Sequence, residues 1–147
     1  MIGGTIRPQI TGEKGNFFEW INAGHISIRG GQGSMFENLR PITAIHYGSS
    51  ETHLYFRVHI AEDFQDDMKI LFHITGLDEK LVLRRSHQNQ PPPGGEVAFH
   101  ELLEFSLGIE KLGIKPDSTL EFSLHLHEDD ISIQRYPEQG AYTFQYQ

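Results

Sequence analysis

The clearest pattern in the sequence is Leu120-Glu121-Phe122-Ser123-Leu124-His125-Leu126-His127, in which large apolar residues alternate with polar ones. Side chains on a β-strand alternate between two faces, so this stretch predicts a strand with one face on a core. The same period of two occurs at residues 54–60 and again at residues 142–146. We therefore expect a fold made mainly of half-buried strands.

Turn residues lie between most of the expected strands. Gly48-Ser49-Ser50-Glu51, Gly76-Leu77-Asp78-Glu79 and Asp129-Asp130 each separate two apolar stretches. Short polar turns between strands are typical of antiparallel sheets. Further strands are expected at residues 42–47, 69–75, 81–85, 104–108 and 131–135, with a weaker one at 25–29.

These elements predict an all-β fold, an antiparallel β-sandwich of the jelly-roll type with about eight to ten strands. Helix is limited to short turns, which we expect at residues 36–39 and 109–112. The expected core consists of the inward residues of the strands: Leu54, Phe56, Val58, Ile60, Ile70, Phe72, Phe105, Leu107, Phe122, Leu124 and Leu126.

Composition excludes several classes of function. The chain has 147 residues, which suits one domain over residues 1–147, and with no cysteine it has neither disulfides nor a thiolate site. A formal net charge of -8 argues against binding nucleic acid or anionic lipid through charge. No apolar run approaches the length of ~20 residues that spans a membrane. No signal segment is visible at the N-terminus, which favours a cytoplasmic location.

One segment departs from the strand pattern. Residues 86–95 end in Pro91-Pro92-Pro93-Gly94-Gly95, and proline cannot donate to a central ladder. We expect a surface loop with almost nothing to bury.

Nine histidines raise the question of a metal site. His125 and His127 stand two apart on the predicted strand and share a face, where His59 could join them from a neighbouring strand. The histidine pair of cupin metal sites is preceded by a glycine six residues earlier, and Thr119 stands there. The interpretation that we favour places these histidines on a solvated strand face, so we predict no metal ligand set.

Paired carboxylates occur at Asp66-Asp67 and at Glu128-Asp129-Asp130, in expected turns. Calcium prefers oxygen ligands, but the spacing of an EF-hand is absent. Aspartate is common in turns for local reasons, and we predict no cofactor.

The aromatic residues carry the more specific hypothesis. Trp20, the single tryptophan, follows Phe17-Phe18-Glu19. A tryptophan face can stack on a sugar ring while a neighbouring carboxylate accepts hydroxyl hydrogen bonds, although a core anchor is the commoner role. Tyr47, Tyr55 and Tyr136 are weaker candidates.

Three patches resemble a known family. The first patch is Phe18-Glu19-Trp20-x-x-Ala23-Gly24, and the second comprises Gly33-Ser34-Met35-Phe36, Ile45-His46-Tyr47-Gly48 and Leu54-Tyr55-Phe56-Arg57. Both resemble the β-rich accessory domain that follows the catalytic barrel in glycoside hydrolase family 57, the amylase and amylopullulanase group. Phe36 replaces a histidine of that pattern. Leu107-Gly108-Ile109 through Pro116 and Arg135-Tyr136-Pro137 are similar to segments of DOMON-like and family 9 carbohydrate-binding sandwiches.

The resemblance implies a domain from the C-terminal end of a larger glycosidase. The family's catalytic carboxylates lie on the barrel, so it implies no catalytic residue and no enzyme activity for this chain. The expected partners are an α-glucan or oligosaccharide and the catalytic barrel. The carbohydrate or interface candidates are Phe18, Glu19, Trp20, Tyr47, Tyr55, Arg57 and Tyr136.

Two other functions stay open from the residues. One is a purely structural domain that packs on the barrel and stabilises it. The other is a metal-dependent jelly-roll enzyme, suggested by the histidines.

Overall fold

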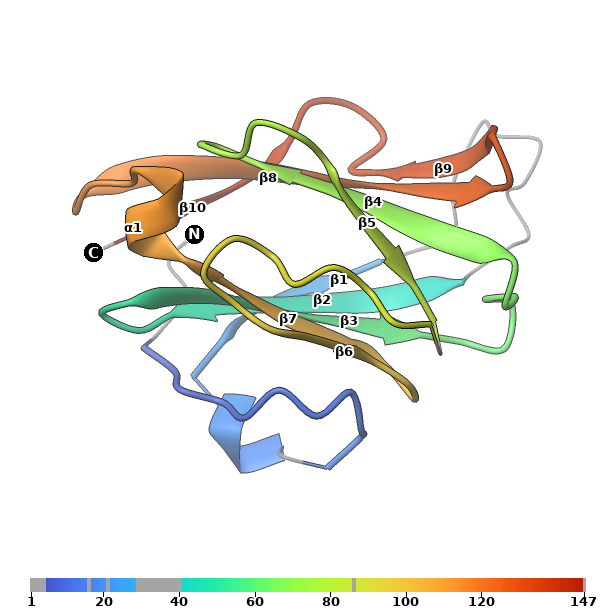
Figure 1. Ribbon diagram of the computed structural model, residues 1–147, viewed down its shortest axis with the longest axis horizontal. Coiled ribbons are helices and arrows are strands. Elements are labelled where there is room, and N and C mark those ends of the chain that lie inside the picture. Colours follow the sequence, from blue (N-terminus) through green and yellow to red (C-terminus); the bar gives the residue numbers. More distant parts are fainter. Residues whose placement is uncertain (1–4, 16, 21, 29–40, 86, 147) are drawn as a thin grey trace.

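The chain folds into two antiparallel β-sheets packed face to face, as the computed structural model in Figure 1 shows for residues 5–15, 17–20, 22–28, 41–85 and 87–146. Sheet A contains β1 (Gly24–Ser27), β2 (Ile42–Ser49), β3 (His53–Ile60), β7 (Leu103–Gly108) and β6 (Val97–Phe99), in that spatial order. Sheet B contains β10 (Tyr142–Tyr146), β8 (Ser118–Glu128), β4 (Met68–Ile74) and β5 (Leu81–Arg84), and β9 (Ile131–Tyr136) also pairs with β8. The predicted all-β sandwich is confirmed.

The core lies between the sheets and is aromatic at its centre. The ring of Phe56 lies 4.8 Å from that of Phe72, 5.2 Å from that of Phe105 and 5.1 Å from that of Phe122, measured between centroids. The predicted core residues are buried, with the exception of Ile60. Ile60 is the last residue of β3 and packs against the core from its margin, which leaves it partly exposed.

The predicted turns join the strands as expected, and α1 (Ile109–Leu112) is the helical turn predicted at 109–112. The other predicted turn, at residues 36–39, lies outside the described residues. Two elements were not predicted: β6 and a 3₁₀ turn at Phe17–Trp20. In the described part of the chain, no helix is long and apolar enough to cross a membrane.

The proline-rich segment is a loop, but it is not free of the core. Pro92 is buried, and the Gly95 N–H donates to the Pro92 carbonyl at 3.0 Å. A Cβ on Gly95 would lie 1.8 Å from the carbonyl oxygen of Ser106 in β7. The expectation that this loop has almost nothing to bury is therefore wrong for its second half, which packs on sheet A.

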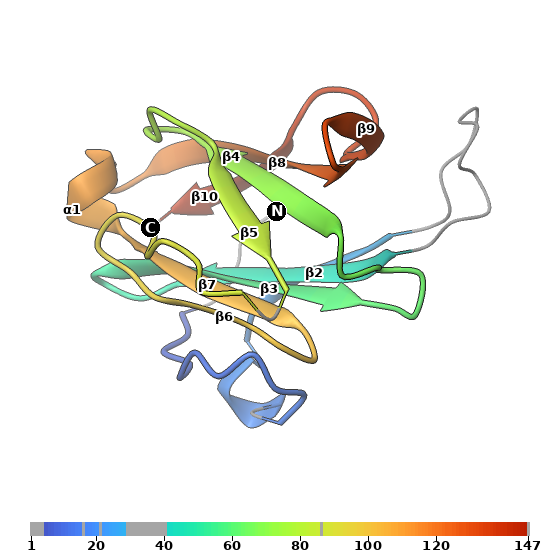
Figure 2. The same ribbon diagram turned by 45° about the vertical axis from the view of Figure 1, so that its right-hand side comes forward.

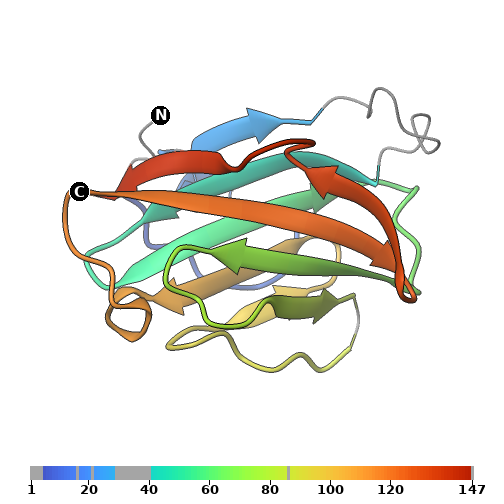
Figure 3. The ribbon, with the colours of Figure 1, turned by 90° about the horizontal axis from the view of Figure 1, so that it is seen from above.

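The N-terminal segment, residues 5–15, crosses the outer face of sheet A together with the 3₁₀ turn (Figure 2). The Ile6 N–H donates to Ser49 at 2.9 Å, and Gly12 accepts from the Leu102 N–H at 3.1 Å. In the view of Figure 3, by contrast, no described segment crosses the outer face of sheet B. The two outer faces of the sandwich therefore differ in the described part of the chain: residues 5–15 cross one of them, and no described segment crosses the other.

Candidate functional site

The candidate tyrosines fall on different faces. Tyr47 is 1% exposed and lies between the sheets, with its ring centroid 5.0 Å from that of Phe144. Tyr136 is also buried, and its hydroxyl donates to the Gln134 side chain. Burial raises the pKa of the Tyr136 hydroxyl. Neither ring is open to a ligand, whereas Tyr55 is partly exposed on the outer face of sheet A.

Trp20 is buried against the outer face of sheet A. It is 4% exposed, the Arg57 guanidinium lies 5.8 Å from its ring centroid, and Tyr55 meets it edge-on at 6.5 Å. A ring enclosed in this way offers no face to a sugar, so the geometry favours the anchor role. Glu19 is exposed and accepts the Gln9 N–H at 3.3 Å, and the side chain of Phe18 lies outside what the structure describes.

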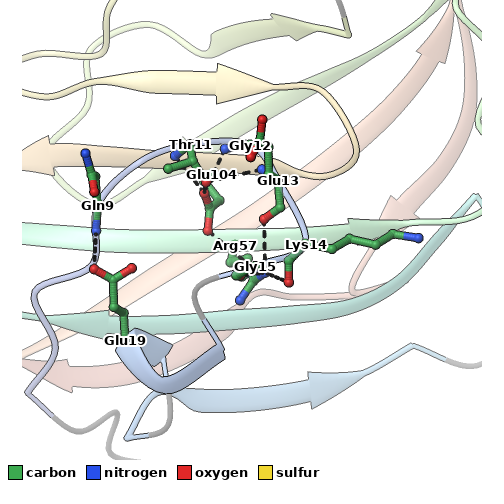
Figure 4. A network of polar contacts seen from close by, with 9 residues as sticks. All are labelled: Gln9, Thr11, Gly12, Glu13, Lys14, Gly15, Glu19, Arg57 and Glu104. Carbon is green, nitrogen blue, oxygen red and sulfur yellow. Dashed lines mark hydrogen bonds and ion pairs between the residues drawn. The ribbon is translucent and has the colours of Figure 1, made fainter.

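A buried ion pair joins β3 to β7 beneath the same segment (Figure 4). Arg57 and Glu104 are directly opposite each other in the register, and Arg57 Nε lies 3.4 Å from Glu104 Oε2. Glu104 Oε1 accepts the backbone N–H groups of Thr11 at 2.9 Å and Gly12 at 2.8 Å. A buried carboxylate held in this way needs both its hydrogen bonds and its counter-charge.

The guanidinium completes the contact with the segment. Arg57 Nη2 donates to the carbonyl oxygens of Glu13, Lys14 and Gly15 at 3.3, 3.2 and 2.9 Å. Desolvation lowers the pKa of Arg57, an effect opposed by the charges of Glu104 and Glu19. We call Trp20, Arg57 and Glu104 the clamp, because their polar and aromatic contacts hold residues 5–15 and 17–20 on sheet A.

Glu104 was not identified from the sequence as a candidate site residue. It stands in Leu103-Glu104-Phe105-Ser106-Leu107, whose alternation directs Glu104 and Ser106 away from the core. That alternation is the one available signal, since the pairing of Arg57 with Glu104 depends on the β3–β7 register.

A pocket of about 320 Å³ opens beside the clamp, where Tyr55 meets the proline-rich loop. The Tyr55 ring lies 6.0 Å from that of His53, whose Nε2 is 3.0 Å from the Gly94 carbonyl oxygen. The buried Ser106 hydroxyl accepts the Glu96 N–H at 3.0 Å. The lining residues are Pro8, Ile10, His53, Tyr55, Gly94, Gly95, Glu96 and Ser106.

The structure separates the three histidines that the sequence offered as weak metal-ligand candidates. His125 and His127 project from the outer face of sheet B, with ring centroids 6.3 Å apart. His59 is on β3 in sheet A, so it faces the opposite side of the sandwich. Within the described residues no group of three or more histidine, aspartate or glutamate side chains is arranged to hold a metal ion.

Another histidine cluster was not anticipated. His25 pairs with His46 across β1 and β2, with stacked rings 4.7 Å apart, and the His59 ring is 5.0 Å from that of His46. Burial and then the charges of His59, His25 and Arg57 lower the pKa of His46 to about 4. His46 is therefore neutral in the folded chain near pH 7.

This pKa predicts acid sensitivity. Between pH 6.5 and about 4 the unfolded chain binds a proton at His46 that the folded chain does not bind, so the free energy of unfolding falls as the pH falls through this window. After allowance for solvent screening of a half-buried group, we expect the loss to be about 1 kcal/mol. Urea denaturation across this range should show a shallower pH dependence for His46→Gln than for the native chain. The exposed His100→Gln is the control, and a slope unchanged by His46→Gln would contradict the assignment.

Comparison with protein-family models and with curated proteins finds no match to this chain. The functional argument therefore rests on the residues and their geometry.

Proposed function

We propose that this chain is a non-catalytic, carbohydrate-associated module of a family 57-like α-glucan-active glycoside hydrolase, and that it binds oligosaccharide in the Tyr55 pocket. The observation that carries this proposal is the pocket itself, which brings a partly exposed aromatic ring together with a carboxylate and a hydroxyl. An aromatic ring packs on the C–H face of a sugar, and a few convergent polar groups fix its orientation.

The pocket is held by rigid parts of the fold. Tyr55 is on β3 and Ser106 is on β7, two paired strands of sheet A in which these residues are opposite each other. The loop side is fixed by the Gly108 N–H, which donates to Pro93 at 2.8 Å, and by the close approach of Gly95 to β7. A pocket volume of about 320 Å³ is at the small end for ligand sites and suits one sugar unit of a chain that continues into solvent.

The clamp supports this pocket rather than forming it. Trp20 packs edge-on against Tyr55, and the N-terminal segment that the clamp holds supplies Pro8 and Ile10 to the pocket wall. Trp20 and Arg57, which carry part of the family resemblance, therefore have an indirect role in binding: they hold Tyr55 in position.

A purely structural module is the second candidate. The observation that favours it is that Trp20, Tyr47, Arg57 and Tyr136 are all buried and occupied by contacts within the chain. In this function the motif residues stabilise the sandwich, which packs on a catalytic barrel and has no ligand of its own.

Calorimetric titration with maltoheptaose separates the two candidates. We expect saturable binding that Tyr55→Ala weakens by about tenfold or more, since the ring supplies the apolar contact, and that Tyr55→Phe largely retains. Glu96→Gln should weaken binding by a smaller factor, whereas the exposed Glu101→Gln, outside the pocket, should not change it. No binding to the folded native chain would leave the structural role as the better description.

A further inference from the structure

The outer face of sheet B carries a cluster of basic residues on a chain whose net charge is -8. Lys69 of β4 pairs with Arg84 of β5 on one side and with His127 of β8 on the other. In the adjacent cross-strand row, His125 of β8 pairs with Arg135 of β9. We call the following residues the basic face: Lys69, Lys80, Arg84, His125, His127 and Arg135.

These charges lie close enough to affect one another. The pKa of His125 is lowered by burial first and then by the positive charges of Lys80, Arg135 and His127. Glu121, which stands on β8 with the same outward parity as His125, is about 13 Å farther along the strand. Ion pairs among the described residues join Arg7 to Glu51 and Arg57 to Glu104, so no described carboxylate lies within 4.0 Å of the lysine and arginine nitrogens of the basic face.

An apolar pair stands among the cations. Leu71 of β4 is directly opposite Val82 of β5, in the same row as His125, and Val82 is 41% exposed. Figure 3 shows that no described segment covers these strands from outside. The face therefore offers an apolar centre with positive charge on both sides.

We propose that the basic face docks an acidic protein segment, whose carboxylates meet Lys69, Arg84 and Arg135 while an apolar side chain covers Leu71 and Val82. Charge complementarity favours an acidic partner, because the lysine and arginine side chains of this face, to which no described carboxylate is paired, repel one another until an anion lies between them. A protein segment suits the face better than an acidic polysaccharide. The tyrosines of the neighbouring strands face the core: Tyr136 is buried, and Tyr142 lies against Phe122 with ring centroids 5.4 Å apart.

This site is independent of the Tyr55 pocket. The pocket is on the outer side of sheet A and the basic face is on the outer side of sheet B, with the core between them. A result at one site consequently leaves the other proposal standing.

Fluorescence anisotropy with a labelled peptide tests the proposal. The probe is a peptide of about twelve residues, glutamate throughout except for leucines at its centre, compared with a lysine peptide of the same design. We expect the acidic peptide to bind the native chain and the lysine peptide not to bind. Raising the salt from about 0.02 M to about 0.3 M should weaken binding by about tenfold, since salt screens exposed charges.

Two double variants with the same change in net charge locate the site. Lys69→Glu with Arg84→Glu should weaken binding of the acidic peptide by at least about tenfold, whereas Lys14→Glu with Lys115→Glu, at exposed positions outside this face, should change it by less than about twofold. Circular dichroism of both variants confirms that each is folded, and an unfolded first variant is replaced by Lys69→Gln with Arg84→Gln. Equal losses in both variants, failure of the acidic peptide to bind, or preferential binding of an alginate oligosaccharide would overturn the proposal.

Discussion

Replacing Glu104 by glutamine is expected to lower the free energy of unfolding by about 3–5 kcal/mol. The carboxylate is 0% exposed, accepts hydrogen bonds from two backbone N–H groups of the N-terminal segment and from the Thr11 hydroxyl, and forms an ion pair with the Arg57 guanidinium. Glutamine presents one acceptor oxygen and one amide nitrogen, so its N–H₂ must face a donor. The Arg57 charge is then left buried without a counter-charge.

The fluorescence of Trp20, a residue of the clamp, reports the change. Trp20 is the single tryptophan and is buried against Arg57 and Tyr55 of sheet A, so release of residues 5–15 and 17–20 should shift its emission to the red. Urea denaturation of Glu104→Gln should show the loss of stability, and the red shift should precede loss of β-sheet circular dichroism. Glu101→Gln makes the same chemical change at an exposed position and should cost less than about 0.5 kcal/mol. A Glu104→Gln protein as stable as this control would show that the ion pair does not stabilise the fold.

A double variant separates the stability contributed by the Arg57–Glu104 ion pair from the cost of leaving one buried charge unpaired. Arg57→Met with Glu104→Leu removes both charges, so its loss of stability should be smaller than the sum of the two single losses. It should still exceed zero, because the carbonyl oxygens of Glu13, Lys14 and Gly15 lose their donor.

The strands could be predicted because their signal is local. In β3 and β8 each residue's direction follows from its parity, and the inward leucines and phenylalanines identify the core without knowledge of the partner strand. β6 is three residues long, too short for an alternation to be recognised. The packing of Pro93 and Gly95 on β7 depends on contact between distant segments, which no local pattern specifies.

The site could be predicted only in part. Tyr55 is an aromatic residue at an outward position, so the sequence made it a candidate, but its pocket is assembled from the N-terminal segment, β3, β7 and the proline-rich loop. The same holds for Glu104, whose partner is on another strand, and for His25, His46 and His59, which come from three strands. Properties that arise from register between distant segments are absent from any single stretch.

Replacing Phe56 by alanine is expected to lower the free energy of unfolding by about 4 kcal/mol. Phe56 is 0% exposed, and its ring contacts those of Phe72, Phe105, Phe122 and Phe144, which come from both sheets. Its removal leaves a cavity at the centre of the sandwich, and the surrounding rings are held by their strands and cannot close it. A loss of this size approaches the whole stability of many domains, so Phe56→Leu, which keeps most of the volume, provides a measurable second variant with an expected cost of about 1.5 kcal/mol.

The matched control for Phe56 is its neighbour on the same strand. Tyr55→Ala removes an aromatic ring of similar size from the outer face, where the ring is partly exposed, and should cost about 1–2 kcal/mol. Urea denaturation of the three variants, followed by circular dichroism, should therefore place Phe56→Ala as the least stable by a clear margin. Equal losses for Phe56→Ala and Tyr55→Ala would contradict the inward and outward assignment of β3, because that assignment makes one ring the centre of the core and the other the wall of an open pocket.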